Sequence, residues 1–418
     1  MDAKTGDKVK VLTEKEEFVG VLMPRPEILE KDVTIIKLDN GYNVGIENNK
    51  IKSIETLEKY TPKTIEKKEL KPKKHLPNIT ILSTGGTISS KIDYRTGGVY
   101  ADYTAEDFVE MMPELASIAN LKAKKIMSIM SEDMSAKDWL IIAKEIETEL
   151  NSGADGVVIT QGTDTLHYST AAASFLLKDL NKPVIFTAAQ RSIDRGSSDA
   201  YLNLLCAITA AAKSDIAEVM TCMHATTDDN YCFLIRGTKV RKMHTTRRDA
   251  FRPINDIPIA KVHENGDIEV LSNYKKQQEK ETKVKTETEI EEDVGLIYIY
   301  PGIKSESLEG YKGLVLTATG LGNLPLRLFK KIEKLNIPVV LAAETIYGRL
   351  HPLVYTNVRQ LSMKLNCIFA EDMTPETAYV KLCYVLSKTQ NKNKVKELML
   401  TDIAGEIKER SLDKEFLY

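Results

Sequence analysis

The sequence predicts an α/β protein with a core of parallel strands and crossover helices, preceded by a small all-β domain. Two apolar, β-branched runs begin at Ile79 and Gly156 and stop abruptly at glycine-containing loops, as strands covered on both faces do. Segments of helical composition alternate with such runs, which favours right-handed crossover connections. Residues 6–57 instead contain several short β-rich runs without a convincing helix, which is the pattern of a small β-barrel.

The composition is that of a large folded chain. With 418 residues, 42% of them hydrophobic and 28% charged, it can bury a sizeable core and should divide into two or three domains. A formal net charge of −2 makes it a poor binder of polyanions by itself, because nucleic-acid affinity depends on Lys and Arg contacts to phosphate. No apolar stretch reaches the roughly 18 residues of a membrane span, and the first residues lack a signal-peptide core. We therefore expect a cytoplasmic protein.

Cysteine and histidine residues give no sign of a metal site. The five cysteines are scattered, mostly within apolar runs and without a C-x-x-C pair, so we expect buried free thiols. The six histidines lack ligand spacing, and no phosphate-binding G-x-x-x-x-G-K-[ST] motif occurs. We predict no metal and no cofactor in this chain.

Composition shifts along the chain suggest its domain boundaries. The Asn40-Gly41 pair between β-rich runs is a hairpin signal within the first domain. A segment rich in Lys, Glu and Pro then reads as a linker, and a second polar stretch separates two α/β lobes. The predicted parts are a small β-barrel domain at 1–60, a linker at 61–77, a first lobe at 78–272, a polar connector at 273–294, and a second lobe with a helical tail at 295–418.

The expected elements of the two lobes follow from apolar periodicity and capping residues. Ser135 followed by Asp138 indicates a helix start, and Thr104 followed by Asp107 indicates another. We expect first-lobe helices at 135–150, 166–177 and 198–212 and strands at 156–159, 184–187 and 218–222. We expect second-lobe strands at 295–300, 313–317 and 338–342 and helices at 326–335, 356–365 and 375–386.

Three short motifs carry candidate chemistry. Thr84-Gly85-Gly86-Thr87 ends the first apolar run, and Gly162-Thr163-Asp164-Thr165 ends the second. Lys242 lies close to Thr245 and Thr246 in a polar stretch between strand-like runs. Because parallel strands carry functional loops at their carboxyl ends, two threonines and a Lys–Asp pair are expected to gather at one edge of the sheet.

The order, spacing and context of these motifs over residues 76–251 resemble the L-asparaginase/glutaminase family. The resemblance implies a two-lobed asparaginase-like core and hydrolysis of a side-chain amide. It implies that Thr87 is the nucleophile, and that Thr163, Asp164 and Lys242 form a second catalytic group for activation or proton transfer. An unactivated hydroxyl attacks amides slowly, so Lys242 would act as base or relay after losing its proton, which burial or a nearby cation favours.

The same resemblance implies a substrate-binding set. Ser131 and Glu132 lie where the family grips the amino-acid end of its substrate, and Tyr100 is similar in position to the flexible-loop tyrosine. Backbone amides at Gly86 and Gly162 are plausible oxyanion or carboxylate donors. Three alternatives stay open: Asp164 could hold the substrate's α-ammonium group, Thr163 could merely cap the next helix, and Lys242 could be a surface charge.

Three features distinguish the sequence from ordinary asparaginases and point to one subgroup of the family. The chain has an amino-terminal extension, Glu132 in place of a common glutamine, and Gly320-Leu321-Gly322-Asn323 in the second lobe. This combination is similar to the GatD proteins of the archaeal glutamyl-tRNA(Gln) amidotransferases. That resemblance implies a glutaminase-type subunit supplying ammonia to a GatE-like partner that uses ATP and Mg²⁺.

The implied assembly is a heterotetramer with two of each subunit, built on a homodimer of this chain. Glu-tRNA(Gln) would be held mainly by the partner. For the barrel, contact with a partner subunit is favoured over contact with RNA. The alternatives are a free-standing cytoplasmic L-asparaginase and a catalytically idle scaffold.

Overall fold

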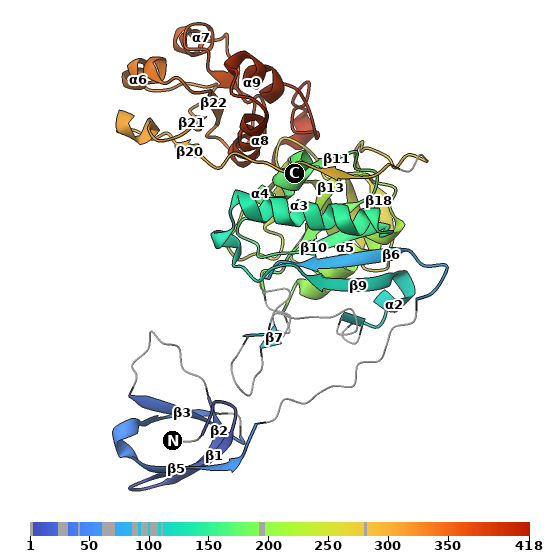
Figure 1. Ribbon diagram of the computed structural model, residues 1–418, viewed down its shortest axis with the longest axis vertical. Coiled ribbons are helices and arrows are strands. Elements are labelled where there is room, and N and C mark those ends of the chain that lie inside the picture. The colour runs from blue at the N-terminus through green and yellow to red at the C-terminus, as the bar shows by residue number, and fades with distance from the viewer. Residues whose placement is uncertain are drawn as a thin grey trace. The chain divides into compact units, whose positions relative to one another are not determined.

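The structure, a computed structural model, describes residues 3–23, 32–40, 42–60, 72–85, 91–92, 99–100, 108–109, 112–191, 197–279 and 282–418. Its contacts divide the chain into two compact units, whose elements are labelled in Figure 1. The first unit is Met1–Leu70 with Ser90–Asp102, and the second is Lys71–Ser89 with Tyr103–Tyr418.

The first unit is all-β in its described part, as predicted. Its amino-terminal segment forms one antiparallel sheet in the order β4-β3-β2-β1-β5, over a small core of Val9, Val11, Ile36 and Ile46. The strands that flank the Asn40-Gly41 pair form a hairpin, which confirms that signal. The strands are β1 (Lys8–Thr13), β2 (Glu17–Leu22), β3 (Val33–Leu38), β4 (Asn43–Glu47) and β5 (Ile51–Glu58), with β7 (Lys91–Ile92) and β8 (Val99–Tyr100) as a separate pair.

The amino-terminal lobe of the second unit is built on an eight-stranded sheet in the order β18-β17-β14-β13-β12-β10-β6-β9. From β9 to β13 the neighbours are parallel, as predicted, whereas β14, β17 and β18 add antiparallel strands that were not predicted. The connection from β13 to β14 is too short for a crossover, so the second strand must run back. The strands are β6 (Asn78–Ser83), β9 (Asn120–Lys125), β10 (Gly156–Thr160), β12 (Val184–Thr187), β13 (Val219–His224), β14 (Tyr231–Arg236), β17 (Ala260–His263) and β18 (Ile268–Val270).

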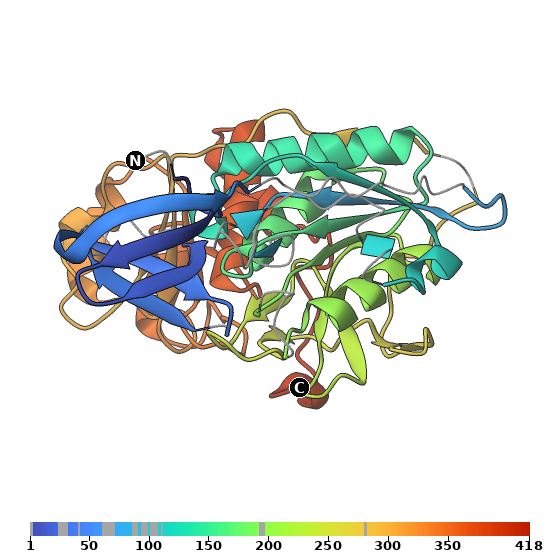
Figure 2. The ribbon, with the colours of Figure 1, turned by 90° about the horizontal axis from the view of Figure 1, so that it is seen from below.

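Helices cover both faces of this sheet. Figure 2 shows α3 and α5 on opposite sides of it, and α4 packs on the same side as α3. Helix α3 begins where the Ser135 N–H donates to the Asp138 carboxylate at 2.7 Å, which satisfies a free amide at the helix start. The predicted helices are confirmed, and the helix expected after Thr104 lies almost entirely outside the described residues. The helices are α2 (Leu115–Ile118), α3 (Ala136–Asn151), α4 (Leu166–Leu176) and α5 (Ala200–Lys213).

The carboxyl-terminal lobe has a four-stranded parallel sheet in the order β20-β21-β22-β23. Helix α8 begins with Pro375 in its first turn and with Thr374 Oγ1 accepting a hydrogen bond from Thr377 N, both favourable at a helix start. The elements are β20 (Val294–Tyr298), β21 (Gly313–Ala318), α6 (Phe329–Lys334), β22 (Val339–Ala343), α7 (Thr356–Met363), β23 (Ile368–Phe369), α8 (Pro375–Lys388) and α9 (Lys392–Met399).

The two lobes share one hydrophobic core. Residues of α3 and α4 lie in the same buried cluster as residues of β21, β22 and α8, and α4 packs directly on α8. Two short pairs complete the unit: β11 (Leu177–Lys178) with β19 (Lys285–Thr286), and β15 (Val240–Lys242) with β16 (Phe251–Pro253). The two lobes therefore belong to one compact unit.

The tail differs from its prediction. The second lobe was expected to end in a helical tail, but α9 ends at Met399 and residues 400–412 contain no helix. There the Glu406 carboxylate accepts hydrogen bonds from the backbone N–H groups of Ile403 and Ala404, and a buried ion pair joins it to Lys381. These contacts stabilise a turn in preference to a helix.

Two further expectations concern residues scattered over the fold. All five cysteines are free and buried, as predicted, and burial raises the pKa of the Cys367 and Cys383 thiols to about 12. Among the described residues, no helix combines the length and apolar character needed to cross a membrane.

Candidate active site

The site lies at the carboxyl ends of neighbouring parallel strands. Ser83 at the end of β6 pairs in register with Thr160 at the end of β10, and Thr84 N donates to Thr160 O at 3.0 Å. The segments that carry the two threonine motifs therefore leave the sheet side by side. Gly85 has φ +110°, and a Cβ there would approach Ile129 O at 2.9 Å, so this position requires glycine.

Lys242 joins the second motif directly. Its Nζ lies 2.8 Å from Thr163 Oγ1 and 2.7 Å from Asp164 Oδ1. The Lys242 side chain is only 11% exposed, whereas that of Asp164 is 63% exposed. A largely covered amine thus meets a hydroxyl and a carboxylate at the sheet edge, with the carboxylate accessible from solvent. Lys242 is therefore not a surface charge.

The loop that carries Thr163 is fixed by Ser131. Thr165 Oγ1 donates to Ser131 O at 2.6 Å, and Asp164 N donates to Ser131 Oγ at 3.3 Å. A Cβ added at Gly162 would lie 2.8 Å from Ser131 Oγ, so the close approach of the two loops depends on that glycine. The N-cap residue of α4 is Thr165. The interpretation of Thr163 as a helix cap is therefore wrong.

Several titratable side chains lie near Lys242 on the side of α4 and α8. His167 on α4 is buried, and burial together with the nearby Arg241 and Lys242 cations lowers its pKa to about 3. Arg241 Nη2 lies 3.1 Å from Glu376 Oε1 on α8. Burial, with the Glu376 carboxylate, raises the pKa of Tyr168 to about 12. His167 and Tyr168 are both neutral near pH 7.

The structure brings together Ser131, Gly162, Thr163, Asp164 and Lys242, all predicted from the sequence. Glu132 is exposed beside Ser131, on the 3₁₀ turn Ser131–Asp133, and no hydrogen bond or ion pair within the described residues holds it. Thr87 and Gly86 lie outside the described residues. Tyr100 belongs to β8, but its side chain is outside the described part.

Sequence reasoning missed His167, Arg241 and Glu376. Arg241 stands next to Lys242, which was a usable signal, but Glu376 is far away in the sequence and no local pattern points to it. Gln161 was also missed: its side chain is fully buried, and neither of its polar atoms has a hydrogen-bond partner among the described residues. No group of His, Cys, Asp and Glu in the described part is arranged to hold a metal ion.

Comparison with known families places three domains along the chain. Residues 78–276 match the N-terminal asparaginase model, 293–399 match the glutaminase/asparaginase C-terminal domain, and 3–57 match the GatD N-terminal domain. The GatD protein of the glutamyl-tRNA(Gln) amidotransferase from Pyrococcus furiosus is 49% identical, over 97% of this chain and 95% of that protein. The chain belongs to the GatD family. The GatD of Methanobrevibacter smithii is 46% identical, over 99% of this chain and 96% of that protein.

Solved structures confirm the asparaginase-like fold of this GatD family member. The thermostable L-asparaginase from Thermococcus kodakarensis matches with TM-score 0.71 and 28% identity, over 80% of this chain and 100% of that one. An L-asparaginase I from Vibrio cholerae matches with TM-score 0.69 and 29% identity, over 80% of this chain and 99% of that one. The similarity to GatD proteins extends over nearly the whole chain and includes the amino-terminal domain. It confirms the interpretation as an amidotransferase subunit over that as a free-standing asparaginase.

Proposed function

We propose that the chain hydrolyses the side-chain amide of glutamine and supplies ammonia to a partner subunit, which converts Glu-tRNA(Gln) to Gln-tRNA(Gln). The observation that carries the proposal is the Thr163–Asp164–Lys242 cluster at the sheet edge, in a chain of the GatD family. Near neutral net charge agrees with a division of labour in which the partner holds most of the tRNA.

The chemistry assigns each group a step. The Thr87 hydroxyl oxygen attacks the amide carbon, the C–N bond breaks, and ammonia leaves after taking up a proton. Water then hydrolyses the ester, releases glutamate and restores the hydroxyl. Lys242, within hydrogen-bond reach of Thr163 and Asp164, relays the protons, since general acid–base groups must lie within about 3.2 Å of the proton they move.

Substrate binding uses the exposed side of the same cluster. The accessible Asp164 carboxylate suits the α-ammonium group of an amino acid, and the Ser131 hydroxyl lies beside it. Glu132, Tyr100 and the amides of Gly86 and Gly162 complete the binding set. This chain holds no cofactor in the proposal: ATP and Mg²⁺ bind the partner.

The proposed assembly is a heterotetramer of two copies of this chain and two of a GatE-like subunit. Leu353, Val354 and Tyr355 form a half-exposed apolar stretch on the carboxyl-terminal lobe, which supports burial against another chain. A homodimer of this chain at the centre of the complex accounts for it.

Glutamate release from glutamine tests the function. The isolated chain should hydrolyse glutamine slowly, and the rate should rise when the partner, ATP and Glu-tRNA(Gln) are added. Lys242→Met should lose nearly all of the stimulated rate, whereas Lys144→Met, which removes an exposed lysine paired only with Glu147 among the described residues, should retain it. Equal rates with and without partner and tRNA would instead indicate a free-standing amidohydrolase.

A further inference from the structure

The strand that carries Lys242 lies outside the two large sheets. Strands β15 and β16 are three residues each and, among the described strands, pair only with each other. A two-stranded hairpin is marginally stable by itself. Val240 and Phe251 pack into the buried core, and the contacts at the base of the hairpin then fix how the strand leaves it.

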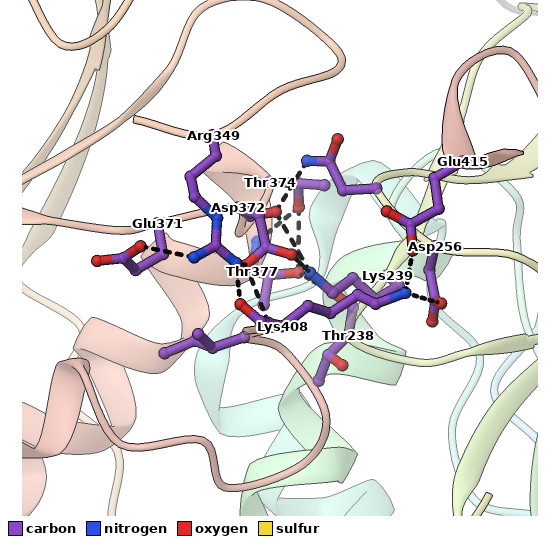
Figure 3. Close-up of polar contacts among 12 residues, drawn as sticks. Thr238, Lys239, Asp256, Arg349, Glu371, Asp372, Thr374, Thr377, Lys408 and Glu415 are labelled. Atoms are coloured by element: carbon purple, nitrogen blue, oxygen red, sulfur yellow. Dashed lines mark hydrogen bonds and ion pairs between the residues drawn. The ribbon is translucent and has the colours of Figure 1, made fainter. Parts of the chain in front are cut away.

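The carboxyl-terminal lobe holds the incoming end of the hairpin. Lys239 Nζ lies 2.7 Å from Asp372 Oδ2, with the two side chains 0% and 2% exposed. Thr377 Oγ1 donates to Thr238 O at 2.8 Å. In Figure 3, Asp372 meets Lys239, and Thr374 lies beside Thr377. Together with the Arg241–Glu376 ion pair, these contacts reach three of the four residues before Lys242.

The outgoing end of the hairpin meets the same segment. Asn255, two residues after β16, donates from Nδ2 to Asp372 O at 2.9 Å and to Gly348 O at 3.0 Å. Gly348 N donates back to Asn255 Oδ1 at 2.8 Å. Lys408 N in the tail donates to Asp372 Oδ1 at 3.1 Å. Both arms of the hairpin are thus anchored at Asp372.

We propose that residues 372–377 are a positioning segment for Lys242, which sets the distance from its Nζ to Thr163 and Asp164. The inference rests on the proposed function, in which Lys242 moves protons. Lys242 lies three residues beyond Lys239 along an extended strand, so a tilt at the base moves its amine. Displacement of about 1 Å in a catalytic geometry can cost roughly a hundredfold in rate. The positioning residues act through Lys242 and do not touch the substrate.

The alternative is that these contacts only hold the lobes together. In that case their loss lowers stability but leaves the folded molecules fully active. A positioning role predicts that loss of these contacts lowers kcat at unchanged KM and makes the hairpin more mobile. A purely structural role predicts neither change in the folded molecules.

Thr377→Val tests the proposal, since it removes one hydroxyl with almost no change in shape. In the complex we expect kcat for glutamine to fall about tenfold with KM changed less than twofold. In the isolated full chain, amide hydrogen exchange of residues 240–254 should accelerate. Thr377→Ser, which keeps the hydroxyl, should restore both readouts. Thr80→Val is the matched control, because it removes a buried hydroxyl bonded to Glu149, in the amino-terminal half of β6; neither readout should change.

Glu376→Gln is the second variant, in case Thr377→Val fails to fold. It keeps the shape of the side chain and removes the charge paired with Arg241, and it should lower kcat in the same way. Normal kcat and normal hairpin exchange in these variants, beside an inactive Lys242→Met, would overturn the positioning inference alone. A fully active Lys242→Met would overturn the proposed function itself.

Discussion

The two halves of the candidate site are supported in different ways. Thr163 and Asp164 follow β10, whose five residues are all buried between parallel neighbours, and α4 begins directly after their loop. Lys242 stands on a hairpin outside the main sheet, held by side chains that come from the other lobe. The first half rests on a buried strand, its loop and Ser131, 34 positions from Thr165, whereas the contacts that hold the second half join residues more than 100 positions apart.

The largest expected effect tests whether the two halves act as one unit. Thr163→Ala and Lys242→Met should each lower glutamine hydrolysis about 10³-fold or more, because each breaks the same proton path. The double variant should be no slower than the worse single one, since residues acting together fail together. Stimulated glutamate release measures all three. Losses that multiply in the double variant would mean that the halves work independently.

A second prediction compares how the halves respond to damage. Burial lowers the pKa of Lys239, and the Asp372 carboxylate opposes that effect. Asp372→Ala leaves a buried amine without its partner and should lower the free energy of unfolding by about 3–5 kcal/mol. Val158→Ala, in the middle of β10, should cost about 2–3 kcal/mol through the cavity it leaves. Urea unfolding gives both values. A loss of unfolding free energy in Asp372→Ala that is smaller than in Val158→Ala would show that the ion pair contributes little to holding the hairpin.

The smallest effect concerns His167, which belongs to the first half but lies near the cations of the second. Its pKa is lowered from the ordinary 6.5 to about 3, so the unfolded chain binds a proton in that window and the folded chain does not. Stability should therefore fall by roughly 1.4 kcal/mol for each pH unit below about 6. Urea unfolding between pH 7 and 5 measures the slope.

His167→Gln removes this titration and should flatten the slope, whereas His75→Gln, at an exposed position, should leave it unchanged. An identical slope in His167→Gln would mean that this histidine takes up its proton in the folded state.

What the sequence could predict follows the same division. The apolar run and the glycine of Gly156–Gly162 predict the strand, loop and helix that place Thr163, because each step is a local preference. The motif order also predicts Ser131 as a neighbour, through the family resemblance. The ion pairs of Lys239 and Arg241 have no comparable signal, since nothing in a charged residue identifies a partner in another lobe. The connections from β13 to β14 and from β17 to β18 are short, and the β15–β16 hairpin separates β14 from β17, so a pattern of crossover helices does not reveal these antiparallel strands.

The shared core of the two lobes has a consequence for how the chain is made. Helix α4 packs on α8, and α8 is synthesised only after every strand from β6 to β23. Domains generally fold as units while they emerge from the ribosome. Here the amino-terminal lobe leaves the ribosome with the apolar face of α4 uncovered and with the Lys242 hairpin unanchored. Both wait for a late helix, so a nascent chain exposes this apolar surface throughout the synthesis of the segment between α4 and α8.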